Sequence, residues 1–155
     1  MAKALDPVLT SNTDGYGPVG SDAGADTLAH YRDWRKRRLK RGTFLPRLFR
    51  GWELRDEGWD ELDEERLRAQ LGAGPYQRLV GEDVVIAFAF AQLVVDGDVA
   101  SADRERALIA VKRQGLPCVM EFRGWSDPSV RLRALDLMRQ ALAEAAEAGS
   151  GREDD

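Results

Sequence analysis

The turn Asp96-Gly97-Asp98 places two carboxylates two residues apart, a spacing found in sites that bind divalent cations. Counted as a calcium loop from Asp96, however, the stretch has Ala100 and Ala107 at the fifth and twelfth positions, which normally supply oxygen ligands. A tight Asp-Gly turn followed by a helix capped by Ser101 accounts for every residue of the stretch. We therefore expect a structural turn that binds no metal ion tightly.

The longer stretch from Val95 to Arg106 resembles the helix, acidic turn, helix unit of the tellurite-resistance TerB family. The resemblance covers residues 84–116, where an apolar segment precedes the turn and an amphipathic helix follows it. It implies metal binding by Asp96 and Asp98, because the carboxylates of this turn are associated with metal in that family. A small TerB-like metal-binding regulator is thus one alternative function.

The side chains needed for covalent or metal-assisted catalysis are scarce. The chain has one histidine, His30, and one cysteine, Cys118, so neither an intrachain disulfide nor a His-rich zinc site can form. The dense carboxylates between Glu53 and Glu65 are typical of a solvated face, which does not raise a pKa for acid–base catalysis. We expect no enzymatic activity, no catalytic residue and no cofactor.

A glycine-rich stretch, Gly15-Tyr16-Gly17-Pro18-Val19-Gly20, has some of the character of a phosphate-binding loop. Phosphate loops of the common type follow a strand and end in Lys-Ser or Lys-Thr, and neither feature is present here. The glycines, prolines and acidic residues of this region instead predict a flexible arm over residues 1–27.

Charge is strongly segregated along the chain, although the formal net charge is only −4. Residues 51–66 form an acidic block, and residues 31–50 form a basic block with nine cations against Asp33. The nine are Arg32, Arg35, Lys36, Arg37, Arg38, Lys40, Arg41, Arg47 and Arg50. Such a block is typical of contact with nucleic acid or an anionic membrane surface. We favour neutralisation by the acidic block or by a partner protein, because the whole chain is acidic.

Residues 28–59 are predicted to hold a short basic helix, which begins near Leu28 and ends at Gly42, and an aromatic docking segment. We interpret the docking segment from Thr43 to Trp52 as extended, since Pro46 and the glycines Gly42 and Gly51 interrupt the chain there. So many aromatic side chains must pack either on the chain's own core or on another chain, because aromatic residues and Arg are enriched in interface cores. The candidate partner-binding residues are Arg35, Arg38, Phe44, Leu48, Phe49, Trp52 and Trp59.

The hydrophobic pattern predicts a mainly α fold, in which a helical domain of residues 60–148 follows the long N-terminal arm and a polar tail covers residues 149–155. Helices are expected over about 61–71, 84–95, 102–114 and 128–148. An α+β fold with a hairpin around Asp96-Gly97 is the alternative, because residues 84–95 also alternate as a strand does. Residues 118–122 are expected to form a short strand or a buried connector.

Together these features favour a non-catalytic structural or accessory subunit that docks on other protein subunits through its N-terminal arm, in a homo- or hetero-oligomeric assembly. Arg outnumbers Lys by 19 to 4, a usage that we take to indicate a GC-rich bacterial or bacteriophage gene. The subunit would then belong to a bacteriophage virion or to a bacterial complex, with a cytoplasmic or virion location. Nucleic-acid binding by residues 32–50 is the other alternative. No apolar run approaches the roughly 20 residues that span a bilayer.

Overall fold

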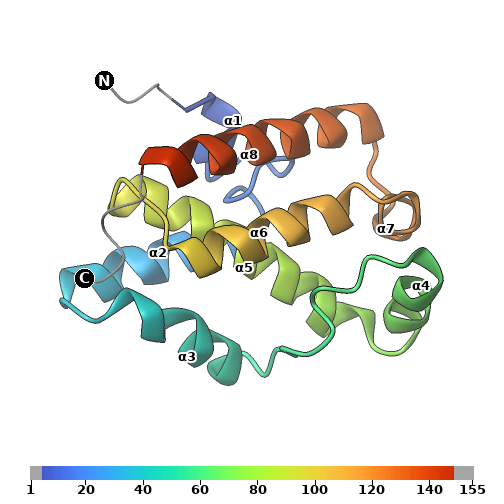
Figure 1. Ribbon diagram of the computed structural model, residues 1–155, viewed down its shortest axis with the longest axis horizontal. Helices are drawn as coiled ribbons and strands as arrows, with labels where there is room; N and C mark the ends of the chain where they lie inside the picture. Colours follow the sequence, from blue (N-terminus) through green and yellow to red (C-terminus); the bar gives the residue numbers. More distant parts are fainter. Residues whose placement is uncertain (1–4, 149–155) are drawn as a thin grey trace.

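The mainly α fold predicted from the sequence is confirmed by the structure, a computed structural model that describes residues 5–148 (Figure 1). Within these residues no strand occurs, so the alternative of a hairpin around Asp96-Gly97 is wrong. In chain order the elements are α1 Pro7–Thr10, α2 Asp22–Lys36, the 3-10 turn η1 Arg41–Thr43, α3 Phe44–Gly51, α4 Glu64–Gly72, α5 Pro75–Val95, α6 Ser101–Gln114, α7 Pro117–Arg123 and α8 Pro128–Ala148.

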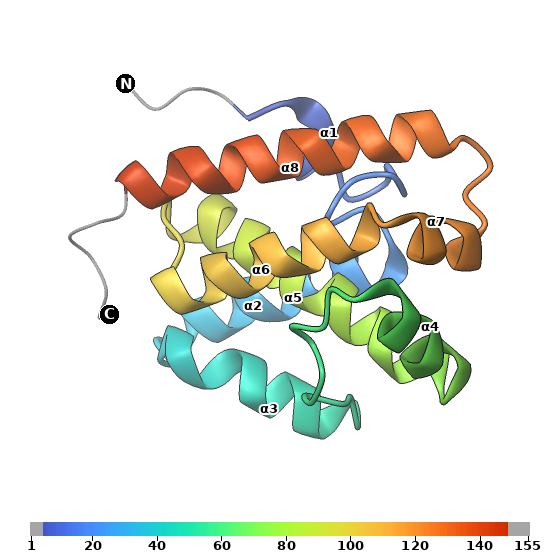
Figure 2. The ribbon, with the colours of Figure 1, turned by 45° about the vertical axis from the view of Figure 1, so that its right-hand side comes forward.

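Helix α5 runs through the middle of the molecule, and the other helices lie around it (Figures 1 and 2). Every residue from Val84 to Ala91 is at most 4% exposed, so this part of the helix is buried on all sides. Helices α2, α3, α4 and α6 contact it directly, and α8 packs on α6. A helix that is apolar all round must be covered all round, which is why this segment is a core helix rather than a half-exposed strand.

The N-terminal half of the chain supplies part of that cover. The rings of Tyr31 in α2, Phe44 in α3 and Phe88 in α5 pack against one another, with centroids 5.0 or 5.1 Å apart in each pair. Phe44 and Phe49 are only 3% and 6% exposed. The sequence left open whether the aromatic side chains pack on the chain's own core or on another chain. Phe44 and Phe49 pack on the chain's own core.

Three segments expected to be irregular or extended are helical. Residues Phe44–Gly51 of the docking segment form α3, in which Pro46 is the third residue and so falls in the first turn, where a missing N–H is tolerated. The segment 118–122 lies in α7, which begins at Pro117 for the same reason. Helix α2 begins at Asp22, inside the stretch assigned to a flexible arm, because the side chain of Ser21 caps it by accepting a hydrogen bond from the amide of Gly24.

Of two predicted helix starts, one is confirmed and the other, a helix capped by Ser101, is wrong. Asp127 caps α8 by accepting a hydrogen bond from the amide of Val130 at 3.3 Å, and Pro128 is the first helical residue. Ser101 is the first residue of α6 rather than its cap, which is Ala100. None of the helices within residues 5–148 combines the length and the apolar character needed to cross a membrane.

The shared core predicts that Phe44→Ala will lower the free energy of unfolding by about 3–5 kcal/mol, the usual cost of emptying a buried Phe site. Urea denaturation followed by circular dichroism measures it. Phe122→Ala is the control, because Phe122 is 46% exposed and its truncation should change stability by less than about 0.5 kcal/mol. Equal, small effects of both changes would show that α3 is not part of the core.

Candidate functional site

The turn Asp96-Gly97-Asp98 joins α5 to α6 and is occupied by side chains from the N-terminal half of the chain. Tyr31 Oη donates to Asp96 Oδ2 at 2.5 Å, and Arg35 Nε donates to Asp96 Oδ1 at 3.0 Å. Arg41 is buried, and its Nη1 donates to Asp98 Oδ1 at 2.5 Å. Gly97 has a φ of +81°, a left-handed conformation that glycine adopts without strain.

These contacts give the two carboxylates a structural role. Both carboxylates bind guanidinium groups, and a cation would have to displace Arg41 and Arg35 to reach the oxygens that a TerB-like site would use. Burial, together with the adjacent Asp96 carboxylate, raises the pKa of Tyr31 above its usual range, so its hydroxyl stays a donor even in alkaline solution. Among the residues that the structure describes, no three His, Cys, Asp or Glu side chains are grouped so that they could hold a metal ion.

The candidate partner-binding residues separate into buried and accessible sets. Phe44 and Phe49 are buried in the core, and Arg35 is bonded to Asp96. Leu48 is half-buried. Arg38 is exposed and has a φ of +57° at the C-terminal end of α2. The structure therefore does not bring the seven residues together into one exposed surface.

The two tryptophans among these candidates are half-buried and contact different groups. Trp52 lies edge-on to His30, with ring centroids 5.9 Å apart. The Trp59 ring lies under the guanidinium of Arg106, whose Cζ is 4.9 Å from the ring centroid. Trp59 is thus held against α6 rather than against the basic block.

The basic and acidic blocks do not neutralise one another through ion pairs in the described part of the chain. Asp56 pairs with Arg106 of α6 at 2.6 Å, and Glu57 lies 4.0 Å from Arg78 of α5. Seven of the nine cations in residues 31–50 are exposed and form no ion pair with any described carboxylate. They are Arg32, Lys36, Arg37, Arg38, Lys40, Arg47 and Arg50, and we refer to them as the basic surface.

A groove of about 370 Å³ lies between α3 and α6, and its lining residues Arg41 and Pro46 directly follow and precede Lys40 and Arg47 of the basic surface in the chain. Leu45 and Phe88 form part of its apolar floor, and Ile109 and Trp59 contribute half-buried side chains. The remaining lining residues are Arg41, Gly42, Pro46, Ala102, Asp103, Glu105 and Arg106. Pattern reasoning missed this groove because its two walls lie about sixty residues apart in the sequence.

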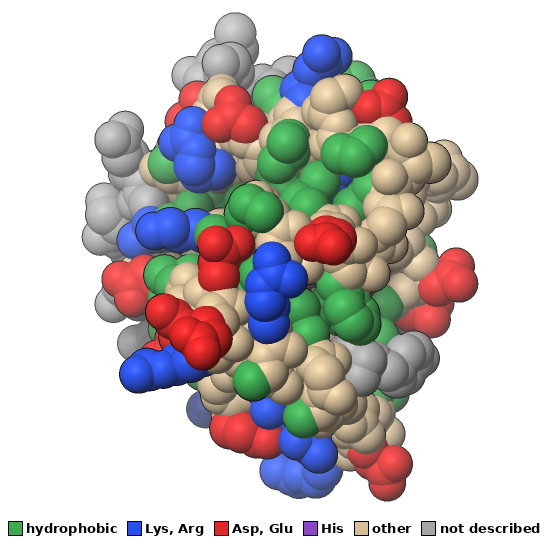
Figure 3. Space-filling model, turned by 90° about the vertical axis from the view of Figure 1, so that its right-hand side faces the viewer, with side chains coloured by type: hydrophobic (Ala, Val, Ile, Leu, Met, Phe, Trp, Pro, Cys, Tyr) green, Lys and Arg blue, Asp and Glu red, His purple; other side chains and the backbone are tan. Residues whose placement is uncertain are grey.

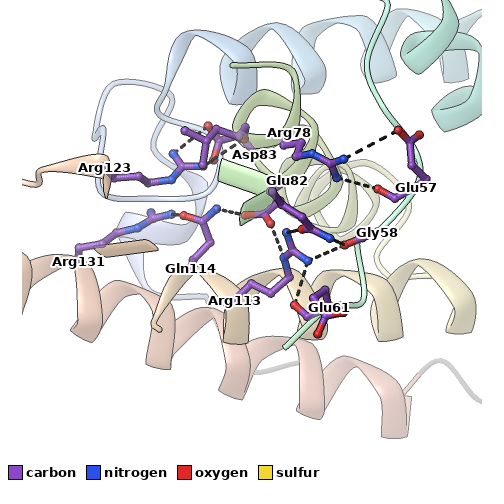
Figure 4. A network of polar contacts seen from close by, with 12 residues as sticks. Glu57, Gly58, Glu61, Arg78, Glu82, Asp83, Arg113, Gln114, Arg123 and Arg131 are labelled. Carbon is purple, nitrogen blue, oxygen red and sulfur yellow. Dashed lines mark hydrogen bonds and ion pairs between the residues drawn. The ribbon is translucent and has the colours of Figure 1, made fainter. Parts of the chain in front are cut away.

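A network of polar side chains links α5 and α6 to the loop that precedes α4 (Figure 4). Glu82 of α5 accepts hydrogen bonds from Arg113 Nε and Gln114 Nε2, both at 2.5 Å. Burial raises the pKa of Glu82 above its ordinary value, while Arg113 and Gln114 act in the opposite direction. A Glu whose oxygens are used in this way holds α5 and α6 together rather than serving as an accessible acid.

The same Arg113 fixes the loop that carries Trp59. Its Nη1 donates to the carbonyl oxygens of Gly58 at 2.8 Å and Glu61 at 3.0 Å, and its Nη2 donates to Gln70 Oε1 at 3.3 Å. The sequence held one signal for this arrangement, because Arg113 and Gln114 continue the buried helical spacing of Ala107, Ala110 and Val111. A charged residue at a buried position of this kind needs a buried partner of opposite charge or a hydrogen-bond acceptor.

Comparisons of the chain with family models, with curated proteins and with solved structures find no match. The resemblance of residues 84–116 to the TerB family thus remains a local pattern, with its two carboxylates bound to arginines.

The arginine contacts predict that Asp98→Asn will lower the free energy of unfolding by about 2 kcal/mol, because it weakens the main ion pair of the buried Arg41. Thermal unfolding measures this loss of stability. Millimolar calcium should change the unfolding midpoint of neither the native protein nor the Asp98→Asn variant. Asp136→Asn serves as the control, since the Asp136–Arg139 pair is exposed on α8. Calcium stabilisation of the native protein that Asp98→Asn abolishes would instead favour a metal site.

Proposed function

We propose that the chain is a non-catalytic subunit that binds an acidic segment of another protein through the α3–α6 groove and the basic surface. The observation that carries the proposal is the basic surface itself, with seven exposed cations that no described carboxylate neutralises. A bacteriophage virion or assembly component and an accessory subunit of a bacterial complex are two settings in which such a subunit would work.

Charge and apolar area together define the partner. Clustered arginines attract a segment rich in Asp and Glu, and they speed its association at low ionic strength. The half-buried side chains of Ile109 and Trp59 in the groove offer apolar area that a purely ionic partner would leave unused. An acidic helix or strand with a large apolar side chain uses both features, since burial of that side chain contributes roughly 25 cal/mol per Å².

The opposite end of the molecule offers less to such a partner. In the view of Figure 3, which faces the end where α4 and α7 lie, the exposed hydrophobic side chains are interspersed with charges of both signs. No single sign of charge dominates this face. The basic surface beside the groove is therefore the better candidate for docking.

Two synthetic peptides test the proposal. Both have fifteen residues and the same number of glutamates, but one carries leucines at helical spacing and the other carries serines in their place. Fluorescence anisotropy at low and moderate salt should show tighter binding of the Glu/Leu peptide. Ile109→Ser in the groove should weaken that binding about tenfold, or ~1.4 kcal/mol, through lost apolar contact.

Charge variants separate the basic surface from a general effect of net charge. Arg37→Glu on the basic surface should weaken binding of both peptides, while Arg133→Glu, an equally exposed change on α8, should leave it unchanged. Equal binding of the leucine peptide and the serine peptide would contradict docking in the groove. Binding of a DNA duplex with a steep salt dependence, near −0.9 in the log–log slope per phosphate contact, with Ile109 dispensable, would assign the basic surface to nucleic acid.

A further inference from the structure

A second cavity, of about 40 Å³, lies on another side of the core, between the glycine-rich loop of residues 15–21 and the segment that joins α7 to α8. It is lined by Gly15, Gly17, Pro18, Ser21, Asp83, Ile86, Arg123, Trp125 and Arg131. A water needs roughly 10–15 Å³ by this measure, so the cavity has room for about three oxygen-sized atoms. None of these residues lines the α3–α6 groove.

Three N–H donors of the side chains that line this cavity have no acceptor. Arg123 Nε, Trp125 Nε1 and Arg131 Nε are buried and make no hydrogen bond. Buried donors are nearly always paired in proteins, because an unpaired one loses its bond to water without replacement. All three groups can donate and none can accept, so the missing partner must be an acceptor.

The cavity also carries an uncompensated positive charge. Asp83 pairs with Arg123 at 3.1 Å, but Arg131, which is 3% exposed, forms no ion pair with any carboxylate whose side chain the structure describes. The Arg131 guanidinium donates only to neutral oxygens. These are the carbonyl oxygen of Tyr16 at 2.7 Å and Gln114 Oε1 at 3.5 Å, the second of which is drawn in Figure 4. Desolvation lowers the pKa of Arg131 to about 10, helped by the neighbouring Arg123 cation and opposed by the Asp83 carboxylate, which is already paired with Arg123.

The glycine-rich loop is compact rather than extended. A Cβ on Gly17 would lie 2.1 Å from the carbonyl oxygen of Val8, and one on Gly20 would lie 1.7 Å from that of Asp14, so only glycine fits at either position. The loop leads directly into α2, whose first turn begins at Asp22 beside the cavity-lining Ser21. The positive end of this fifteen-residue helix adds to the attraction for an anion.

We propose that this cavity binds a small tetrahedral oxyanion of the phosphate class. The anion supplies acceptors for the three unpaired donors and a counter-charge for Arg131, and the three oxygens that accept these hydrogen bonds fit the space available. The glycine-rich stretch therefore contributes to an anion site even though it lacks the strand and the Lys-Ser ending of a common phosphate loop. The site is separate from the docking groove, so either proposal can fail without the other.

Titration of the full chain with inorganic phosphate tests the proposal, by calorimetry and by thermal unfolding at constant ionic strength set with chloride. The expected result is binding of one phosphate per chain and a rise in the unfolding midpoint that chloride does not produce. Glycerol phosphate, run in parallel, distinguishes a free anion from the phosphate group of a larger molecule. Equal binding of both ligands supports a phosphomonoester, and binding of inorganic phosphate alone supports a free anion.

Variants locate the binding in the cavity. Trp125→Phe removes one N–H but keeps a ring under Arg131, whose Cζ lies 4.6 Å from the indole centroid, so it should fold and bind phosphate about tenfold more weakly. Arg131→Gln should abolish binding, while the exposed Arg133→Gln on the same helix should not change it. If Arg131→Gln fails to fold, Trp125→Phe decides the matter. Absence of phosphate binding beyond the chloride effect, or affinity unchanged by Trp125→Phe, would overturn the proposal.

Discussion

The need to cover α5 on every side determines the rest of the structure. Its residues from Val84 to Ala91 are buried around the whole circumference, and α6 and α4 contact only part of it. Helices α2 and α3 complete the cover, which brings the N-terminal half of the chain into the core. Because their apolar sides face α5, most of their arginines and lysines face outward and form the basic surface.

Arginine has two roles in this molecule. Arg41 and Arg113 are buried with carboxylate partners, Asp98 and Glu82, and each holds together elements that are distant in sequence. Breaking such a pair is costly because it leaves a buried charge without compensation. Arg131 is buried with no carboxylate partner among the described residues, and this contrast with the other two is the reason to look for a ligand at its cavity.

The sequence predicted what depends on local pattern and missed what depends on long-range pairing. Helical spacing, the Asp127-Pro128 start of α8 and the Asp-Gly turn were all readable, because each is set by neighbouring residues. The sequence did not show which arginines in residues 31–50 are buried. Arg41 is buried because it pairs with Asp98, which lies 57 residues away. Likewise, Pro46 suggested an extended segment because its place in the first turn of α3 depends on where that helix begins.

The central claim is that α2 and α3 belong to the same cooperative core as α5, which leaves their cations outside. Native-state hydrogen exchange of the full chain tests it most directly, because amides of one cooperative unit open with the same free energy. The account predicts that the central amides of α2 exchange through the same opening as those of α5, with equal free energies. Exchange of α2 within seconds while α5 stays protected would contradict it and restore a detachable N-terminal arm.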